Sequence, residues 1–264
     1  MKKIFLILFS VIFLMSACSK SNEQKEVKYS ELMNSKKTII SYLVKSNDED
    51  SSSIGKDSEV ISYIVSKNGK YTIYEGANTT LGEIIKKDDD DKLDYIKKQD
   101  KEYFEDNITM SINAIKIDDN NDDLIKSLQN FKYDKPKERD IQIELETDES
   151  GNNTKREFFN IASHGFKDEG SIDVGAKNAE ELYDKDKKKA NPKEYGHYFT
   201  NVVSPFDLYD KKLAGLSNID NIEDNNDYNE PAYEDYKYLV TEVGSKTEKF
   251  KIDQPDDKNV KVND

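Results

Sequence analysis

Two nearly identical runs of β-branched and aromatic residues constrain the fold of this chain more than any other feature. The runs are IISYLV at residues 39–44 and VISYIV at residues 60–65, and this composition is typical of β-strands. Asn68-Gly69 then separates the second run from another strand-like run at residues 70–75. Because a type I′ turn needs a positive φ at both central residues, this dipeptide between two such runs predicts a tight antiparallel hairpin.

Helical signals follow the hairpin. Thr80 and Glu83 have the spacing of a capping box, which predicts the start of a short helix. The acidic run at residues 88–91 suits the positive end of a second helix dipole. We expect a strand at residues 107–117, where apolar residues alternate, and another short helix that begins at Asp122.

Strand signals continue to the C-terminus and outnumber the helical ones. A short helix is expected at residues 179–188, and Gly244-Ser245 is expected to join the last two strands. The further strands are expected at residues 139–147, around Phe158, and at residues 195–203, 233–243 and 246–252. We therefore predict an α+β fold that is β-rich, with a largely antiparallel sheet and a few short helices. We expect one domain over residues 31–254 and a loose tail at residues 255–264.

The N-terminal segment has the order of a secretory signal peptide. Lys2 and Lys3 precede an apolar run at residues 4–15, and the small residues Ser16 and Ala17 follow it. Twelve helical residues span only about 18 Å, which is short of the ~30 Å hydrocarbon core of a bilayer. We expect residues 1–17 to be a removable leader.

The single cysteine of the chain gives this leader a specific form. The sequence Leu14-Met15-Ser16-Ala17-Cys18 resembles the bacterial lipobox, with Met15 where leucine is usual. The resemblance implies that Cys18 receives a diacylglyceryl group carrying chains such as palmitate, and that cleavage makes it the first residue. Two acyl chains suffice for stable anchoring. Residues 18–30 would then be the lipidated cysteine and a flexible tether. An ordinary secreted protein with an incidental cysteine is the alternative.

Basic residue usage indicates the source of such a protein. Arg139 and Arg156 are the only arginines among 40 basic residues, and this bias is typical of AT-rich genomes. Together with the lipobox it favours a low-GC Gram-positive bacterium. We therefore expect a lipid anchor on the extracytoplasmic face of the cell membrane.

Charge and cysteine content exclude several classes of protein. The formal net charge is −14 and no basic stripe is present, so we expect no nucleic-acid partner, because phosphate attraction supplies most of that affinity. One cysteine excludes an internal disulfide framework and a cysteine-based zinc site.

Acidic clusters at residues 88–91, 118–123 and 220–227 are the candidate cation sites. Asp118, Asn120 and Asp122 match the first three ligand positions of an EF-hand loop. Position six is Asp123 instead of glycine, and position twelve is Gln129 instead of a carboxylate. These three residues are therefore weak candidates for calcium, and we interpret the clusters as solvated loops without a metal.

No catalytic constellation is visible. The two histidines, His164 and His197, lack the paired spacing of a zinc site. No nucleophile elbow, P-loop or dinucleotide glycine pattern occurs, so no cofactor is expected. The chain has 16 tyrosines and no tryptophan, and six of the tyrosines cluster around its last quarter: Tyr195, Tyr198, Tyr228, Tyr233, Tyr236 and Tyr238. They suit either peptide recognition or the packing of a sheet that is short of leucine. We favour packing.

The layout as a whole resembles uncharacterised surface lipoproteins of low-GC Gram-positive bacteria. The segments that carry the resemblance are short and turn-rich: Asn68-Gly69-Lys70, Thr80-Leu81-Gly82, residues 150–155, residues 209–212 and residues 238–241. The resemblance implies the anchor and the cellular address, and it transfers no catalytic residue. We expect a non-catalytic binding or interaction protein with an unknown protein or peptide partner. A substrate-binding lipoprotein of a transporter is the alternative, and a cell-envelope enzyme is the third hypothesis.

Overall fold

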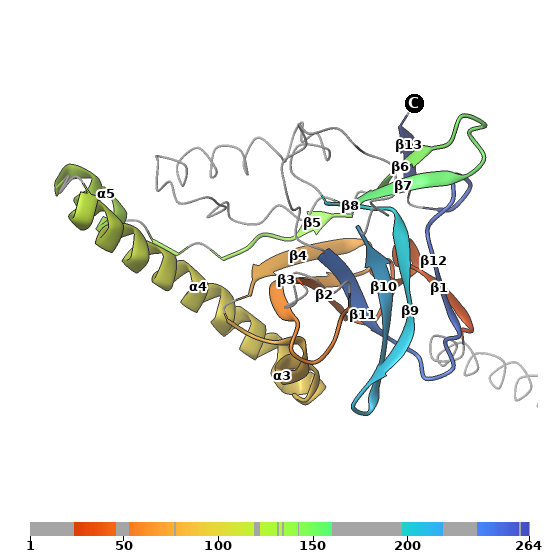
Figure 1. The fold of residues 1–264 in the computed structure, drawn as a ribbon, viewed down its shortest axis with the longest axis horizontal. Helices are drawn as coiled ribbons and strands as arrows, with labels where there is room; N and C mark the ends of the chain where they lie inside the picture. The colour runs from red at the N-terminus through yellow and green to blue at the C-terminus, as the bar shows by residue number, and fades with distance from the viewer. Residues whose placement is uncertain are drawn as a thin grey trace, which may run out of the picture.

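A computed structural model describes residues 24–45, 53–76, 78–118, 122–130, 132–133, 135–141, 143–159, 197–218, 237–258 and 260–263. Its largest element is a seven-stranded sheet in which every neighbouring pair is antiparallel (Figure 1). In spatial order its strands are β5 (Arg139–Asp140), β4 (Lys70–Glu75), β3 (Glu59–Lys67), β2 (Ile39–Lys45), β11 (Lys237–Val243), β10 (Lys211–Ser217) and β9 (Asn201–Leu208).

Two smaller sheets complete the strands. The four-stranded sheet has the order β13 (Val260–Asn263), β6 (Ile143–Thr147), β7 (Thr154–Phe159) and β8 (His197–Phe199). The two-stranded sheet pairs β1 (Glu26–Lys28) with β12 (Lys249–Lys251). Only β1–β12 and β13–β6 are parallel among the described pairs. The predicted α+β, β-rich, largely antiparallel fold is confirmed.

The seven-stranded sheet is buried on both faces, which explains why its central strands are continuous apolar runs. In β2, Leu43 belongs to a core that includes Phe159 and Phe199 of the four-stranded sheet. Tyr42 and Val44, its neighbours in the chain, belong to a second core beneath the helices. Side chains alternate between the faces of a strand, so both cores draw on the same strands.

Tyrosine fills much of this interior. The side chains of Tyr29, Tyr42, Tyr63, Tyr71 and Tyr238 are all buried. Among the tyrosines of the last quarter, Tyr238 lies in β11 with 2% of its surface exposed. At these positions the aromatic rings pack the sheets.

The helices lie mainly on the second face. α3 (Leu81–Ile85) begins with the predicted capping box, in which Thr80 and Glu83 bond to each other's backbone N–H groups. α4 (Asp89–Asp118) begins in the acidic run and is about 45 Å long at ~1.5 Å per residue. Its first half packs beside β4, and its second half extends past the sheet together with α5 (Asp122–Asn130) (Figure 1). α2 (Tyr29–Met33) lies on the other side, next to β1.

The strand predicted at residues 107–117 is wrong, because this segment continues α4. Ile108 and Ile112 are four residues apart and pack against Ile125 and Leu128 of α5. Met110, the third member of the alternating set, is 60% exposed. The apolar residues therefore follow the four-residue spacing of a helix face, although their positions also fit the two-residue alternation of a strand. The short helix expected from Asp122 is confirmed.

The local hairpin is confirmed and the distant pairings differ from prediction. Asn68 and Gly69 both have positive φ, at 53° and 77°, between paired β3 and β4. Residues 139–147 divide into β5 and β6, which belong to different sheets, and residues 195–203 divide in the same way into β8 and β9. β11 and β12 do not pair with each other, because β12 pairs with β1.

The folded part extends past both boundaries that we predicted for it. Within the predicted tether, Val27 is 3% exposed and Tyr29 is fully buried, because β1 pairs with β12 and α2 packs on the core. Within the predicted loose tail, residues 260–263 form β13 alongside β6. The leader, the predicted helix at residues 179–188 and the acidic cluster at residues 220–227 lie outside the described residues. None of the described helices is both long enough and apolar enough to cross a membrane.

Candidate functional site

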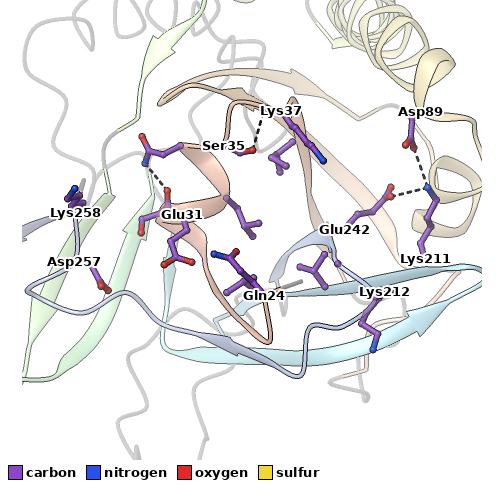
Figure 2. Close-up of a pocket in the computed structure, with 18 of the residues that line it drawn as sticks. Gln24, Glu31, Ser35, Lys37, Asp89, Lys211, Lys212, Glu242, Asp257 and Lys258 are labelled. Carbon is purple, nitrogen blue, oxygen red and sulfur yellow. Dashed lines mark hydrogen bonds and ion pairs between the residues drawn. The ribbon is translucent and has the colours of Figure 1, made fainter. Parts of the chain in front are cut away.

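A groove of about 1260 Å³ lies where the N-terminal segment meets the ends of β10 and β11 (Figure 2). We call it the polar groove, since charged side chains lie at both of its ends and a few apolar ones between them. Its walls come from five parts of the chain: residues 24–39, the start of α4, the β9–β10 turn, the end of β11 and residues 256–258. The apolar lining residues are Val27, Leu32, Ile39 and Val243.

One end of the groove holds a network of four charges, which we call the Lys92 cluster. The Lys92 side chain is 2% exposed, and its ammonium group forms ion pairs with Glu242 and, at 3.1 Å, with Asp89. Lys211 lies 3.4 Å from each of the same two carboxylates. The Tyr42 hydroxyl donates to Glu242 over 3.3 Å. Asp89 and Lys92 meet because they are three residues apart on the first turn of α4.

Three groups of this cluster have pKa values that their surroundings shift. The hydrogen bond from Lys92 lowers the pKa of Asp89. The charge of Glu242 raises the pKa of Lys211. Burial, followed by the nearby Glu242 charge, raises the pKa of the Tyr42 hydroxyl well above its ordinary value. Asp89 and Lys211 are therefore ionised at neutral pH, and Tyr42 acts only as a neutral donor.

A strained turn holds the rim next to this cluster. Tyr209 and Asp210 form the two-residue connection between β9 and β10, and Tyr209 has a φ of 57°. A bulky residue in this region costs about 1–3 kcal/mol and persists only when its surroundings compensate. Part of the compensation is the Lys86 ammonium of the segment after α3, which lies 4.5 Å from the centroid of the Tyr209 ring. The turn thereby places Asp210 and Lys211 at the edge of the groove.

The other end of the groove is built by contacts between the two ends of the described chain. The Lys28 ammonium pairs with Asp257 at 2.5 and 2.7 Å, and the Gln254 N–H donates to the same carboxylate over 2.6 Å. Burial alone would lower the pKa of Lys28, but its hydrogen bond and ion pair with Asp257 give a net rise. These contacts attach the segment after β12 to β1.

Several lining charges have no ion-pair partner within the described part of the chain, and they are available to a ligand. The lysines in this state are Lys37, Lys212 and Lys258, and the carboxylates are Glu31, Asp207, Asp210 and Asp256. The lining has seven carboxylates and four lysines. Lys28 and Lys92, which are not part of the lining, pair with three of these carboxylates and leave an excess of one negative charge. The groove therefore favours a ligand with a net positive charge.

Two of the three weak calcium candidates lie at helix ends that the structure describes. Asp118 is the last residue of α4 and Asp122 the first of α5, while Asn120 lies outside the described residues. Within the described ranges, no three His, Cys, Asp or Glu side chains gather closely enough to hold a metal ion. Cys18 and His164 also lie outside these ranges, and His197 is in β8 opposite Phe159.

Sequence reasoning missed the groove because its residues form no motif. Lys92, Lys211 and Glu242 come from three different elements: α4, β10 and β11. Lys92 and Lys211 are more than a hundred residues apart in the chain. Asp89 and Lys92 alone carry a local signal, the three-residue spacing of an ion pair on a helix. Comparison with known proteins adds no site: no protein family, curated protein or solved structure matches this chain.

Proposed function

We propose that this chain is a lipid-anchored protein of the extracytoplasmic membrane face, and that its polar groove binds a positively charged ligand such as an extended basic peptide without catalysis. The observation that carries the proposal is the position of the groove relative to the anchor. Gln24, which lines the groove, is only six residues after Cys18.

This spacing fixes how far the groove can be from the bilayer. Six extended residues span at most about 20 Å, which is shorter than the tether expected from the sequence because β1 begins at Glu26. The groove would therefore open close to the membrane surface. A ligand bound there is a molecule presented at, or released next to, that surface.

The charge of the groove supports a cationic ligand. Carboxylates outnumber lysines in its lining. The chain as a whole also has a net charge of −14, and this negative charge attracts cations from a distance. The alternative of a transporter's substrate-binding protein predicts two βαβ lobes around a cleft. The described sheets are mainly antiparallel, so that alternative gains no support.

The anchor is tested by acyl labelling in a Gram-positive host. Wild-type protein grown with an alkyne-bearing palmitate should carry the label and sediment with membranes, and Cys18→Ser should lose the label. Ser19→Ala, a substitution at the next residue, is the matched control and should keep it. Label retained by Cys18→Ser would contradict the anchoring site.

The groove is tested with a defined probe. The full chain in phosphatidylcholine vesicles is titrated with a fluorescent lysine-rich decapeptide and, separately, with a glutamate-rich one. Only the lysine-rich peptide should bind. An exposed ion pair contributes about 0.2–1 kcal/mol, so the double variant Asp207→Asn with Asp210→Asn should weaken binding by roughly twofold to thirtyfold.

A charge-matched control separates the groove from the overall charge. Asp140→Asn with Glu149→Gln removes two exposed carboxylates on β5 and on the β6–β7 turn. This variant should leave the affinity within about 1.5-fold of wild type, because screening limits the reach of charges to ~10 Å. Equal weakening by both double variants would show that the peptide does not use the groove.

A further inference from the structure

Two carboxyl groups meet in the interior, away from the Lys92 cluster. Glu157 in β7 and Asp253 just after β12 are both completely buried. Glu157 Oε2 accepts the Asp253 backbone N–H over 3.1 Å. Two buried acids side by side are costly, because each charge loses its hydration and repels the other.

The carboxylate of Asp253 accepts hydrogen bonds from the N-terminal segment. The Ser30 backbone N–H donates to Asp253 Oδ2 over 2.9 Å, and the Ser30 hydroxyl donates to Oδ1. On the other side, the Thr154 hydroxyl donates to the Asp253 carbonyl over 2.5 Å. The Asp253 carboxylate therefore fastens the start of α2 to the segment that follows β12.

Glu157, unlike Asp253, lacks the hydrogen-bond donors that a charged carboxylate needs. Its Oε1 is buried and has no hydrogen-bond partner within the described part of the structure. A charged carboxylate with one oxygen unsatisfied costs far more to bury than a neutral acid. The geometry therefore favours one proton on Glu157 and the negative charge on Asp253, where Ser30 supplies two donors.

The groups around the pair do not neutralise a second charge. Asp257 adds a further negative charge from the segment after β12, and Tyr29 of α2 faces Glu157 with its buried hydroxyl. Lys28 of β1 feels the charge of Asp253, and Asp257 already pairs with this lysine. Tyr71 of β4 also lies close to Tyr29.

We propose that the proton held by the Glu157–Asp253 pair is a latch that keeps the segment next to the membrane anchor, residues 24–34, docked on the domain, and that alkaline pH releases it. Loss of the proton leaves two buried anions, and the simplest relief is to separate Ser30 and Asp253 from Glu157. Release frees eleven residues, which adds up to about 35 Å of reach from the membrane. It also removes the groove wall formed by Ser30 and Glu31.

The sign of the pH dependence follows from the direction of the shifts. Burial, then the charge of Asp253, raises the pKa of Glu157 well above that of a free carboxyl. Burial also raises the pKa of Asp253, against the opposing hydrogen bonds from Ser30. The docked form thus holds more protons than the released form. Docking is strongest at acidic pH and weakens as pH rises through the raised pKa.

Hydrogen exchange measured by mass spectrometry tests the latch on the full chain in detergent. After correction for intrinsic rates, peptides covering residues 24–34 and 252–257 should lose at least tenfold in protection between pH 5 and pH 9. Peptides covering β2 and β3 should not change. Equal protection of the latch segments at both pH values would overturn the proposal.

Three variants test whether Glu157 holds the proton of the pair. Glu157→Gln mimics the neutral acid and should remove the pH dependence. Asp253→Asn takes away the neighbouring charge that raises the Glu157 pKa, so the loss of protection should begin at lower pH. Asp148→Asn is the control, since hydrogen bonds from Ser150 and Asn153 hold the pKa of this exposed carboxyl to about 2, and it should behave as wild type. A wild-type pH dependence in Glu157→Gln, or an unmoved transition in Asp253→Asn, would refute the latch.

Discussion

Lys92 is the buried charge whose removal tests the packing of α4 on the sheet. The change is Lys92→Met, which keeps the length of the apolar stem and deletes the ammonium group. The Lys92 side chain is 2% exposed, and its ammonium group joins α4 to Glu242 at the end of β11. A purely apolar contact at this position would tolerate methionine well.

The expected cost follows from what Glu242 retains. A buried pair that loses one partner is destabilised by about 3–5 kcal/mol. Glu242, however, is 24% exposed and keeps Lys211 at 3.4 Å and the Tyr42 hydroxyl at 3.3 Å. The pair with the exposed Asp89 adds only about 0.5 kcal/mol. We therefore expect Lys92→Met to lower the free energy of unfolding by about 2 kcal/mol.

Urea unfolding followed by circular dichroism measures this change. The midpoint should fall with an unchanged slope, and the melting temperature should fall by roughly 4–8 °C for a domain of this size. In a double-mutant cycle, Lys92→Met with Glu242→Gln should cost about 1–2 kcal/mol less than the sum of the single changes. A Lys92→Met protein within 0.5 kcal/mol of wild type would refute the view that this ion pair holds α4 on the sheet.

Three further changes test other parts of the fold. Thr80→Ala removes the side chain that caps α3 and should cost about 1 kcal/mol in urea unfolding; an unchanged midpoint would mean that the cap contributes nothing. Gly69→Ala should cost more than about 1 kcal/mol, because φ is +77° and a Cβ would lie 2.8 Å from Asn34 Oδ1; equal or greater stability would contradict the strained turn. Above pH 6 the melting temperature should fall as pH rises, since the raised pKa of Glu157 makes the folded state the better proton acceptor; a rising melting temperature between pH 6 and pH 9 would reverse the assigned sign.

Local signals in the sequence predicted local structure correctly. The Asn68-Gly69 turn and the Thr80–Glu83 capping box each depend on backbone conformation within four residues, and both are present. The strand predicted at residues 107–117 failed because Ile108 and Ile112 satisfy helical and strand periodicity equally. Their partners in α5 decided between the two, and no pattern within the segment contains that information.

Long-range pairing explains the remaining differences. The parallel pairs β1–β12 and β13–β6 each join segments more than a hundred residues apart. The short strands β1 and β13 were therefore predicted as parts of a tether and a loose tail, because only their distant partners make them strands. The buried pair of acids has the same origin. Ser30, Glu157 and Asp253 are unremarkable in sequence, and only folding places two acids and a serine in one buried cluster.

The central claim is that the polar groove lies next to the lipid anchor. Energy transfer from a dye on the lipidated protein to an acceptor in the vesicle surface measures this directly. The dye is attached at Lys258→Cys, beside the groove, or at Gln129→Cys in α5, which lies at the opposite end of the molecule from β1 (Figure 1). The account predicts clearly higher transfer from position 258 than from position 129. Equal transfer, or higher transfer from position 129, would contradict it.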